Sequence, residues 1–445
     1  MSDGPADGRD RSSPPVSGVR RVGRNAGRLL AGRIVAQGLL VLSTALLAQR
    51  LGLAGFGGYA FVVAAVFLAN VVTTFGTDMV LIREIAAGGR IGLWSAALAV
   101  QLMLSGGAVI AIWLVAPMIP GQGSEVAWAL RVYVLSLVPA AVYSVCSAAL
   151  RGAGRLGRHA SLGVAAAGLQ LAAIAVLVPP GSSLVLVFTV LLGVQAAIAA
   201  LAWAACASWA AAFRRVPGAS RSDVVGMVRA TGSIGIVGLL GVAYQRAGVL
   251  VLAVAVGPAA TAWFAGGSRI VEASRTGHLA LFGALYPAMA EAHGSTPEDG
   301  ALAGRLAWAW RLSLLGALAI AATLLVVGPV LVRMLYGEAF APASAGLAIL
   351  ALALVPSTIA GYLSLELLAA RRETSALWAL LASLAVLVAL LLALVPAIGW
   401  TGAAWAILGA DAVQAALLLL VTSRRAAPVA GLVPRVPSPH TAGGL

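Results

Sequence analysis

The sequence contains no lysine, and all 29 of its basic residues are arginine. Without lysine there is no phosphate-binding residue for a P-loop and no amine to form a Schiff base, which excludes a nucleotide-driven motor and an aldolase-type enzyme. Charge is also scarce, at 10% of 445 residues, whereas soluble domains typically have about 25%. The two cysteines, Cys146 and Cys206, lie in separate apolar segments, so we expect neither a disulfide nor a metal site.

Apolar residues take the place of the missing charge, at 61% of the chain. They form continuous runs of about 20 residues rich in Leu, Ala and Val, long enough to cross a bilayer as helices. Barrel strands would alternate polar and apolar residues instead. The sequence therefore predicts an all-α polytopic membrane protein of about twelve transmembrane helices. The expected spans are 29–48, 57–76, 91–116, 127–149, 160–179, 183–206, 232–255, 262–288, 312–335, 345–369, 376–396 and 401–422.

The arginines are distributed unevenly between the two sides that these spans define. The tail before the first span and the loops on its side hold 22 of the 29, while the opposite side holds only Arg50. By the positive-inside rule this bias places both termini in the cytoplasm. The net charge of +14 is then mostly a topology signal, with attraction to membrane lipids as a consequence. We expect no nucleic acid partner, since there is no basic face with interleaved aromatics.

A short repeat divides the chain into halves. Gly52-Leu-Ala-Gly-Phe-Gly-Gly-Tyr59-Ala60 follows span one, and Gly257-Pro-Ala-Ala-Thr-Ala-Trp-Phe264-Ala265 follows span seven at an offset of 205. Six helices per half give a parallel pseudo-two-fold repeat. We expect a disordered cytoplasmic tail at 1–28, six-helix bundles at 29–206 and 232–422, a cytoplasmic linker at 207–231 and a second disordered tail at 423–445.

Charged residues inside spans are costly and usually functional. Span eight holds the densest set, because Arg269, Glu272, Arg275 and His278 follow one another at intervals of three. Neighbours at this spacing adjoin on a helix and can pair. The set is either a self-neutralising ladder near the membrane edge or an anion site that faces a cavity, with Glu272 holding the guanidinium groups. Guanidinium groups suit phosphate because their planar fork donates two parallel hydrogen bonds.

The first helix of each half also contains an arginine. Arg246 lies deep in span seven beside Tyr244 and Gln245, and we include all three as candidate substrate-binding residues. Arg33 lies about one turn from the cytoplasmic end of span one. It is either a further candidate for the same site or an arginine that reaches toward the lipid headgroups.

Acidic residues in the spans are candidates for ion coupling. Asp411 and Glu366 are lone acids in spans twelve and ten, where either a proton or Na⁺ carrier or a hydrogen-bonded structural acid fits. Asp78, where span two ends, is a third candidate, although a local salt-bridge cluster with Arg83 and Glu84 explains it as well. Apart from a coupling ion, H⁺ or Na⁺, we expect no cofactor.

Several stretches of the sequence resemble the polysaccharide transporter and O-antigen flippase family. That family belongs to the multidrug, oligosaccharidyl-lipid and polysaccharide (MOP) exporter superfamily. The matching segments occur in the expected order: Leu47-Ala-Gln-Arg-Leu-Gly-Leu-Ala-Gly-Phe-Gly-Gly-Tyr59, Phe75-Gly-Thr-Asp78, Leu81-Ile-Arg83-Glu84, Gly267-Ser-Arg269-Ile-Val-Glu272, Leu335-Tyr-Gly337-Glu-Ala-Phe340-Ala-Pro342 and Leu367-Leu-Ala-Ala-Arg371-Arg372. The sequence departs from the family pattern in lacking an acid near Arg246 and in having Phe264 rather than tyrosine in the second half.

The resemblance implies two six-helix bundles around a central cavity and alternating access. It implies a flippase, not an enzyme, that moves a polyprenyl-diphosphate-linked oligosaccharide across the bacterial inner membrane for surface polysaccharide synthesis. A monomer working near glycosyltransferases and a polymerase is expected. Three alternatives stay open: a multidrug or cation antiporter of the same superfamily, a lipid II flippase, and a polytopic glycosyltransferase or polymerase.

Overall fold

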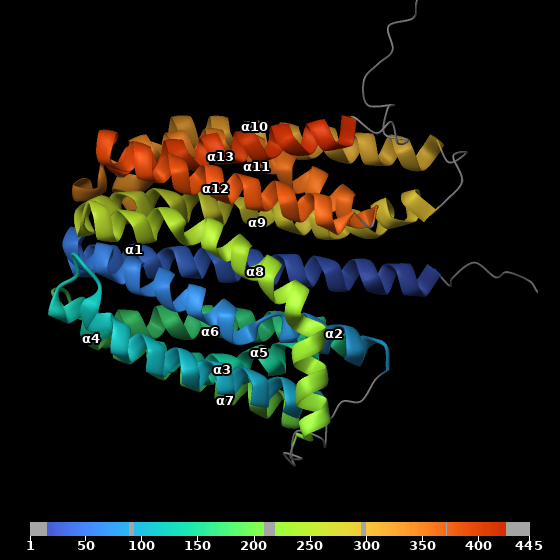
Figure 1. Cartoon of the computed structure of the whole chain (residues 1–445), viewed down its shortest axis with the longest axis horizontal. Coiled ribbons are helices and arrows are strands. Elements are labelled where there is room, and N and C mark those ends of the chain that lie inside the picture. The colour runs from blue at the N-terminus through green and yellow to red at the C-terminus, as the bar shows by residue number, and fades with distance from the viewer. Residues whose placement is uncertain (1–15, 89–92, 209–218, 295–299, 371, 424–445) are drawn as a thin grey trace, which may run out of the picture.

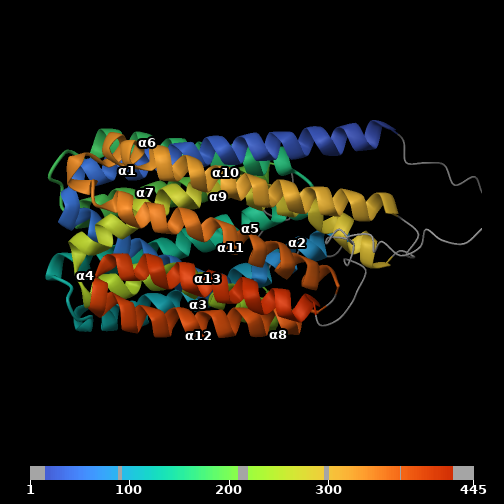
Figure 2. The same cartoon turned by 90° about the horizontal axis from the view of Figure 1, so that it is seen from above.

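The computed structural model describes residues 16–88, 93–208, 219–294, 300–370 and 372–423, and these residues form helices joined by short turns (Figure 1). The long helices lie side by side along one axis, which agrees with the all-α membrane fold predicted from the sequence (Figures 1 and 2). The α-helices are α1 Val16–Thr74, α2 Thr77–Ala86, α3 Leu93–Val115, α4 Ser124–Tyr133, α5 Leu137–Gly152, α6 Leu156–Leu177, α7 Leu184–Ala207, α8 Arg221–Ala255, α9 Pro258–Gly294, α10 Gly300–Tyr336, α11 Ala343–Ala369, α12 Glu373–Ile398 and α13 Trp400–Ser423. Short 3-10 turns at Ala116–Met118 (η1), Val134–Ser136 (η2) and Glu338–Phe340 (η4) complete the described elements.

Twelve crossings of the membrane fit these helices. Ten stretches among the described residues are long and apolar enough to cross a membrane, and one of them is the 44-residue run Ala31–Thr74. That run reverses direction at Gly52, whose φ of 67° interrupts the helix, so it supplies two crossings. Helix α9, which carries Arg269, Glu272 and Arg275, is not among the ten, yet it lies alongside the other spans (Figure 1).

Gly257 makes the matching reversal in the second half, with φ 114° between α8 and α9. The two residues that the sequence repeat aligned thus have the same local role. We call the end of the molecule where Gly52 and Gly257 lie the turn end. The helical ends at Val16 and Ser423 lie together at the opposite end, here the termini end (Figure 1).

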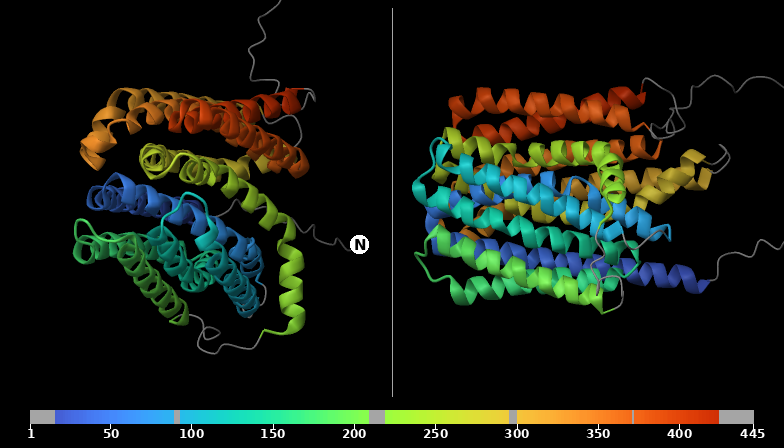
Figure 3. Two further views of the ribbon diagram at one scale, coloured as in Figure 1. Left: turned by 60° about the vertical axis from the view of Figure 1, so that its left-hand side comes forward. Right: turned by 60° about the horizontal axis from the view of Figure 1, so that its bottom comes forward.

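The helices gather in two groups. Helices α1 to α7 lie in one and α9 to α13 in the other, while α8 reaches across both (Figure 3). The first part of α8 packs on α2 and α3, and its later part packs on α1, α9, α12 and α13. The first arm of α1, the end of α9 and the start of α10 extend beyond the other helices at the termini end (Figures 1 and 2).

Two segments that the sequence assigned to a tail and to the linker are helical in the structure. The other predicted domain boundaries stay predictions. Residues 16–28, predicted to be disordered, begin α1, which starts directly after Pro15 and meets no further proline in this stretch. Residues 221–231, predicted as linker, begin α8 because Ser220 caps it by accepting a hydrogen bond from the Asp223 amide. Residues 1–15, 209–218 and 424–445 of the predicted tails and linker lie outside the described residues.

Arg50, the arginine that breaks the charge bias, has a structural partner. Its guanidinium donates hydrogen bonds to the carbonyl oxygens of Ile174 (2.6 Å), Ala175 (3.0 Å) and Val178 at the end of α6. The last carbonyls of a helix have no partner within the helix, and a cation there also offsets the helix dipole. Arg50 thus ties α1 to α6 at the turn end.

We expect Arg50→Met to lower the free energy of unfolding by about 1–3 kcal/mol, because three carbonyls lose a charged donor where no helical partner replaces it. The variant should melt several degrees below the wild type in detergent. Arg333→Met is the matched control, since Arg333 is 60% exposed and its ion pair among the described residues is with the exposed Glu338. Equal melting temperatures for both variants would contradict a capping role for Arg50.

Candidate functional site

A cavity of about 90 Å³ lies where α1, α8 and α9 meet, between the two helix groups. Its apolar lining includes Phe56 and Val63 of α1 and Val249 of α8. Its polar lining consists of Thr44, Tyr59, Arg246, Ser268, Arg269 and Glu272. We call this cavity the charged pocket. Three of the residues selected from sequence, Arg246, Arg269 and Glu272, therefore meet in one place.

The Glu272 carboxylate bridges the two arginines of the charged pocket. Its Oε1 lies 3.0 Å from Arg246 Nη1, and its Oε2 lies 3.3 Å from Arg269 Nη1. Helix geometry explains the second contact, since Arg269 and Glu272 are three residues apart on α9. With two guanidinium groups and one carboxylate, the pocket carries one positive charge in excess. The arrangement suits an anion.

Both guanidinium groups keep unused donors. The Nε atoms of Arg246 and Arg269 are buried and have no hydrogen-bond partner among the described residues. A guanidinium has five N–H donors, and the Glu272 bridge uses one from each arginine. An unpaired buried donor costs free energy, so an incoming oxyanion that satisfies it gains affinity.

Phe67 of α1 fixes the position of Arg246 from the other side. The Arg246 guanidinium carbon lies 4.8 Å from the centre of the Phe67 ring. A cation at this distance over an aromatic face is attracted to it by about 0.5–2 kcal/mol. Arg246 is thus held between a carboxylate on α9 and an aromatic ring on α1, at the contact of the two helix groups.

A second cluster, the Asp411 cluster, lies next to the charged pocket. Asp411 of α13 is only 4% exposed, its Oδ1 accepts a hydrogen bond from the Tyr244 hydroxyl (2.6 Å), and its Oδ2 lies 3.6 Å from Arg275 Nη2. Glu272 and Arg275 are three residues apart on α9, and Tyr244 and Arg246 are two apart on α8. The same two helices therefore connect the cluster and the pocket.

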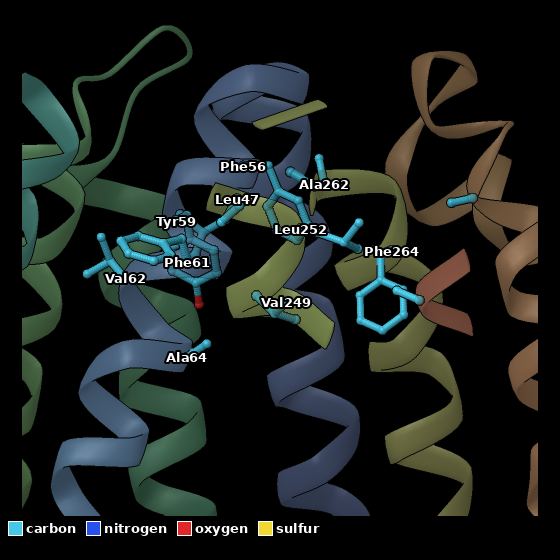
Figure 4. Packing of buried hydrophobic residues seen from close by; sticks show 14 of the residues in the cluster. Leu47, Phe56, Tyr59, Phe61, Val62, Ala64, Val249, Leu252, Ala262 and Phe264 are labelled. Carbon is cyan, nitrogen blue, oxygen red and sulfur yellow. The ribbon is translucent and has the colours of Figure 1, made fainter. Parts of the chain in front are cut away.

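Aromatic rings close the pocket toward the turn end. The centre of the Phe56 ring lies 5.6 Å from that of Tyr59, 6.2 Å from that of Tyr336 and 5.5 Å from that of Phe340. Phe56 therefore joins α1 to the end of α10 and to η4. Figure 4 shows Phe56 facing Leu252 of α8 and Ala262 of α9. Contacts of this kind between the groups seal the turn end of their interface.

Two side-chain amides add hydrogen bonds across the same seal. Gln49 donates to the Leu335 carbonyl (2.8 Å), and Gln122, in the turn after α3, donates to the Ala253 carbonyl (2.7 Å). Gly57 of α1 lies directly against the Pro258 carbonyl, where a Cβ atom would come within 1.9 Å of the oxygen. The structure is therefore closed at the turn end.

The structure does not bring four other predicted residues into the pocket. Arg33 is exposed, and it precedes the pocket residue Thr44 by eleven positions, or roughly 16 Å along α1. Gln245 is also exposed. Asp78 pairs with Arg151 (3.2 Å) between α2 and α5, and Glu366 is on α11 one turn after Tyr362. Their predicted roles stay predictions. The side chain of His278 lies outside the described residues.

Sequence reasoning did not include several pocket residues. Thr44 and Ser268 of the pocket, and Phe67 against Arg246, are small or apolar residues to which the sequence analysis gave no role. Tyr59 did carry a signal, since it ends the repeated turn motif. Its ring stacks on Phe56 and on Phe188 of α7, each with centroids 5.6 Å apart.

Comparison of the sequence with known protein families finds a match. The family model described as "Polysaccharide biosynthesis protein" matches residues 22–293, which is more than half of the chain. No curated protein matches the sequence.

Solved structures share the fold over nearly the whole chain. The inward-facing form of a multidrug resistance MATE family transporter of the MOP superfamily has a TM-score of 0.72 at 17% identity, covering 92% of this chain and 98% of its own. An outward-facing form with the same description has a TM-score of 0.66 at 17% identity, covering 92% and 96%. The lipid II flippase MurJ in an inward closed conformation has a TM-score of 0.72 at 11% identity, covering 89% and 87%. The chain thus has the all-helical MOP fold.

Proposed function

The chain belongs to the polysaccharide biosynthesis protein family, and from this membership we propose that it is a flippase that moves an isoprenyl-diphosphate-linked oligosaccharide across a membrane by alternating access. The charged pocket carries the proposal, because it places two arginines with unused donors between two helix groups at membrane depth. A diphosphate supplies the oxygens that these donors lack. Sugars fit the hydroxyl groups of Thr44, Tyr59 and Ser268.

The net positive charge of the pocket favours an anionic diphosphate over the cationic substrate of a drug exporter. An exporter of cationic drugs would place uncompensated acids in its cavity, whereas Glu272 is outnumbered by Arg246 and Arg269. A lipid II flippase is a close variant, since that substrate also joins sugars to a lipid through a diphosphate.

We propose that the protein lies in the bacterial inner membrane with its termini end toward the cytoplasm, as the arginine bias indicates. The sealed turn end then faces outward, and the structure is in an inward-facing state. The higher TM-score to the inward-facing than to the outward-facing transporter supports this assignment. In that state the pocket would load the glycolipid from the cytoplasmic leaflet, where glycosyltransferases work. The outward-facing state would deliver it to a polymerase outside. We propose a monomer as the working unit.

Reconstitution tests the function directly. The purified chain in liposomes should accelerate the transfer of an isoprenyl-diphosphate oligosaccharide between leaflets at least tenfold over empty liposomes, measured by the fraction of glycan that an external glycosidase reaches. An organic cation dye is the comparison substrate. Transport of the dye without transport of the glycolipid would overturn the proposal in favour of a drug exporter.

A further inference from the structure

The Asp411 cluster is not needed to explain substrate binding, and its geometry points to a second task. Asp411 is 4% exposed and belongs to α13, which lines no part of the charged pocket. A buried carboxylate is costly unless it is paired and hydrogen-bonded. Tyr244 supplies a short hydrogen bond, but Arg275 lies 3.6 Å away, and Asp411 Oδ2 has no hydrogen bond among the described residues. The ionised state of Asp411 thus depends on a loosely held arginine.

Arg275 has an alternative partner on its own helix. It follows Glu272 by three positions on α9, a spacing at which opposite charges adjoin. Glu272 is paired with Arg246 and Arg269, whose remaining donors would bind a diphosphate. Once phosphate oxygens are bound there, the two arginines share their charge with the ligand, and the Glu272 carboxylate lies beside an anion and needs another cation. Arg275 is the nearest one in sequence, and at 36% exposure its side chain is not locked in place.

The net charge of the two sites also indicates that a proton binds together with the substrate. Arg246, Arg269 and Arg275 face Glu272 and Asp411, which leaves one positive charge in excess. A bound diphosphate diester adds about two negative charges, and the combined site would then carry one net negative charge inside the membrane. One proton restores neutrality. Asp411 is the acid that would receive it, because it is the more buried of the two and is the one that loses its cation.

No other described group near Asp411 is placed to take this role. Tyr244 of α8 and Arg275 of α9 are the charged or titratable groups that act on it. Helix α12 contributes the uncharged Ser383 beside Tyr244, and the acid of α11, Glu366, acts on Tyr362 instead.

We propose that diphosphate binding transfers Arg275 from Asp411 to Glu272 and that Asp411 then takes up one proton from the solvent, so that substrate and proton are bound together. The inference rests on the proposed function, since it requires a diphosphate in the charged pocket. Reciprocity follows: protonation of Asp411 frees Arg275 and strengthens substrate binding by the same factor. Affinity for the diphosphate therefore falls as pH rises, by up to tenfold per pH unit for one coupled proton.

Proton uptake on binding is measurable in the purified protein. A diphosphate diester, farnesyl-diphospho-N-acetylglucosamine, serves as the probe because its phosphates do not titrate near neutral pH, and titration calorimetry in buffers with different ionisation heats gives the number of protons taken up per ligand. We expect about one for the wild type near neutral pH and none for Asp411→Asn. Arg275→Gln should also take up none, because a buried carboxylate without its cation is already protonated before the ligand arrives.

Asp78→Asn is the matched control. Asp78 is also a membrane-helix acid paired with an arginine, at 3.2 Å from Arg151, but it belongs to the other helix group. This variant should keep one proton per ligand. Binding by the wild type without proton uptake, or uptake that persists in Asp411→Asn, would overturn the inference alone. Absence of binding of this diphosphate diester by the wild type would overturn the proposed function and the inference with it.

Discussion

Arg246→Gln should reduce glycolipid translocation by roughly ten- to a hundredfold. Arg246 projects from α8 and contacts Glu272 of α9 and Phe67 of α1. It is thus the one cation of the charged pocket that links three helices. Hydrogen bonds to charged groups contribute about 1.5–3 kcal/mol each, and 1.4 kcal/mol is a factor of ten. Glutamine also removes the excess positive charge, since one arginine then balances one carboxylate. The measurement is the leaflet-transfer rate in liposomes.

Two further substitutions separate binding from folding. Arg246→Lys keeps the charge but loses the planar fork, so transport should fall less than in Arg246→Gln. Arg333→Gln removes an arginine from a membrane helix outside the pocket and should leave the rate within about twofold of the wild type. Melting temperatures should stay close to the wild type in all three. Wild-type transport by Arg246→Gln would remove the charged pocket from the mechanism.

Hydropathy predicts most of the fold because each membrane helix must satisfy its own backbone and hide its own polar groups. The sequence could not show that the first two spans form one helical run broken only at Gly52, since an isolated glycine is compatible with a turn, a kink or a straight helix. It also could not place the start of α8, because the capping residue Ser220 lies in a polar segment whose composition is typical of a loop.

The candidate site was predictable only as far as local spacing reaches. The Arg269 to Glu272 pair follows from helix periodicity. The other contacts join residues far apart in the sequence: Arg246 to Glu272 across two helices, and Tyr244 to Asp411 across 167 positions. A lone acid in an apolar span indicates that a partner exists, but not which helix supplies it.

The seal at the turn end explains why small residues matter in the repeated turn. Alternating access requires that contacts on one side of the substrate site break while those on the other side form. In this structure the seal depends on Gln49, Gln122, the rings around Phe56 and the contact of Gly57 with Pro258. Gly57 and Pro258 meet backbone to backbone, so no side-chain rearrangement can make room for a larger residue at position 57.

Gly57→Ala should therefore open the turn end. The added Cβ would lie 1.9 Å from the Pro258 carbonyl oxygen and 2.6 Å from its carbon, so α1 and α9 must separate for both to fit. Overpacking at such a contact costs about 1–3 kcal/mol, which lowers the population of the closed state by roughly five- to a hundredfold relative to open states. Spin labels on Met118→Cys and Met334→Cys, at exposed positions of η1 and α10, should report a longer distance in the variant.

The native thiols do not interfere with this labelling, because Cys146 and Cys206 are both buried. Gly106→Ala is the matched control: Gly106 lies within α3, and an added Cβ would meet nothing within 4 Å. That variant should keep the wild-type distance and gain up to about 1 kcal/mol of stability, since alanine favours a helix over glycine. An unchanged label distance in Gly57→Ala, in a protein that melts like the wild type, would mean that the turn end does not need a glycine at this contact to close.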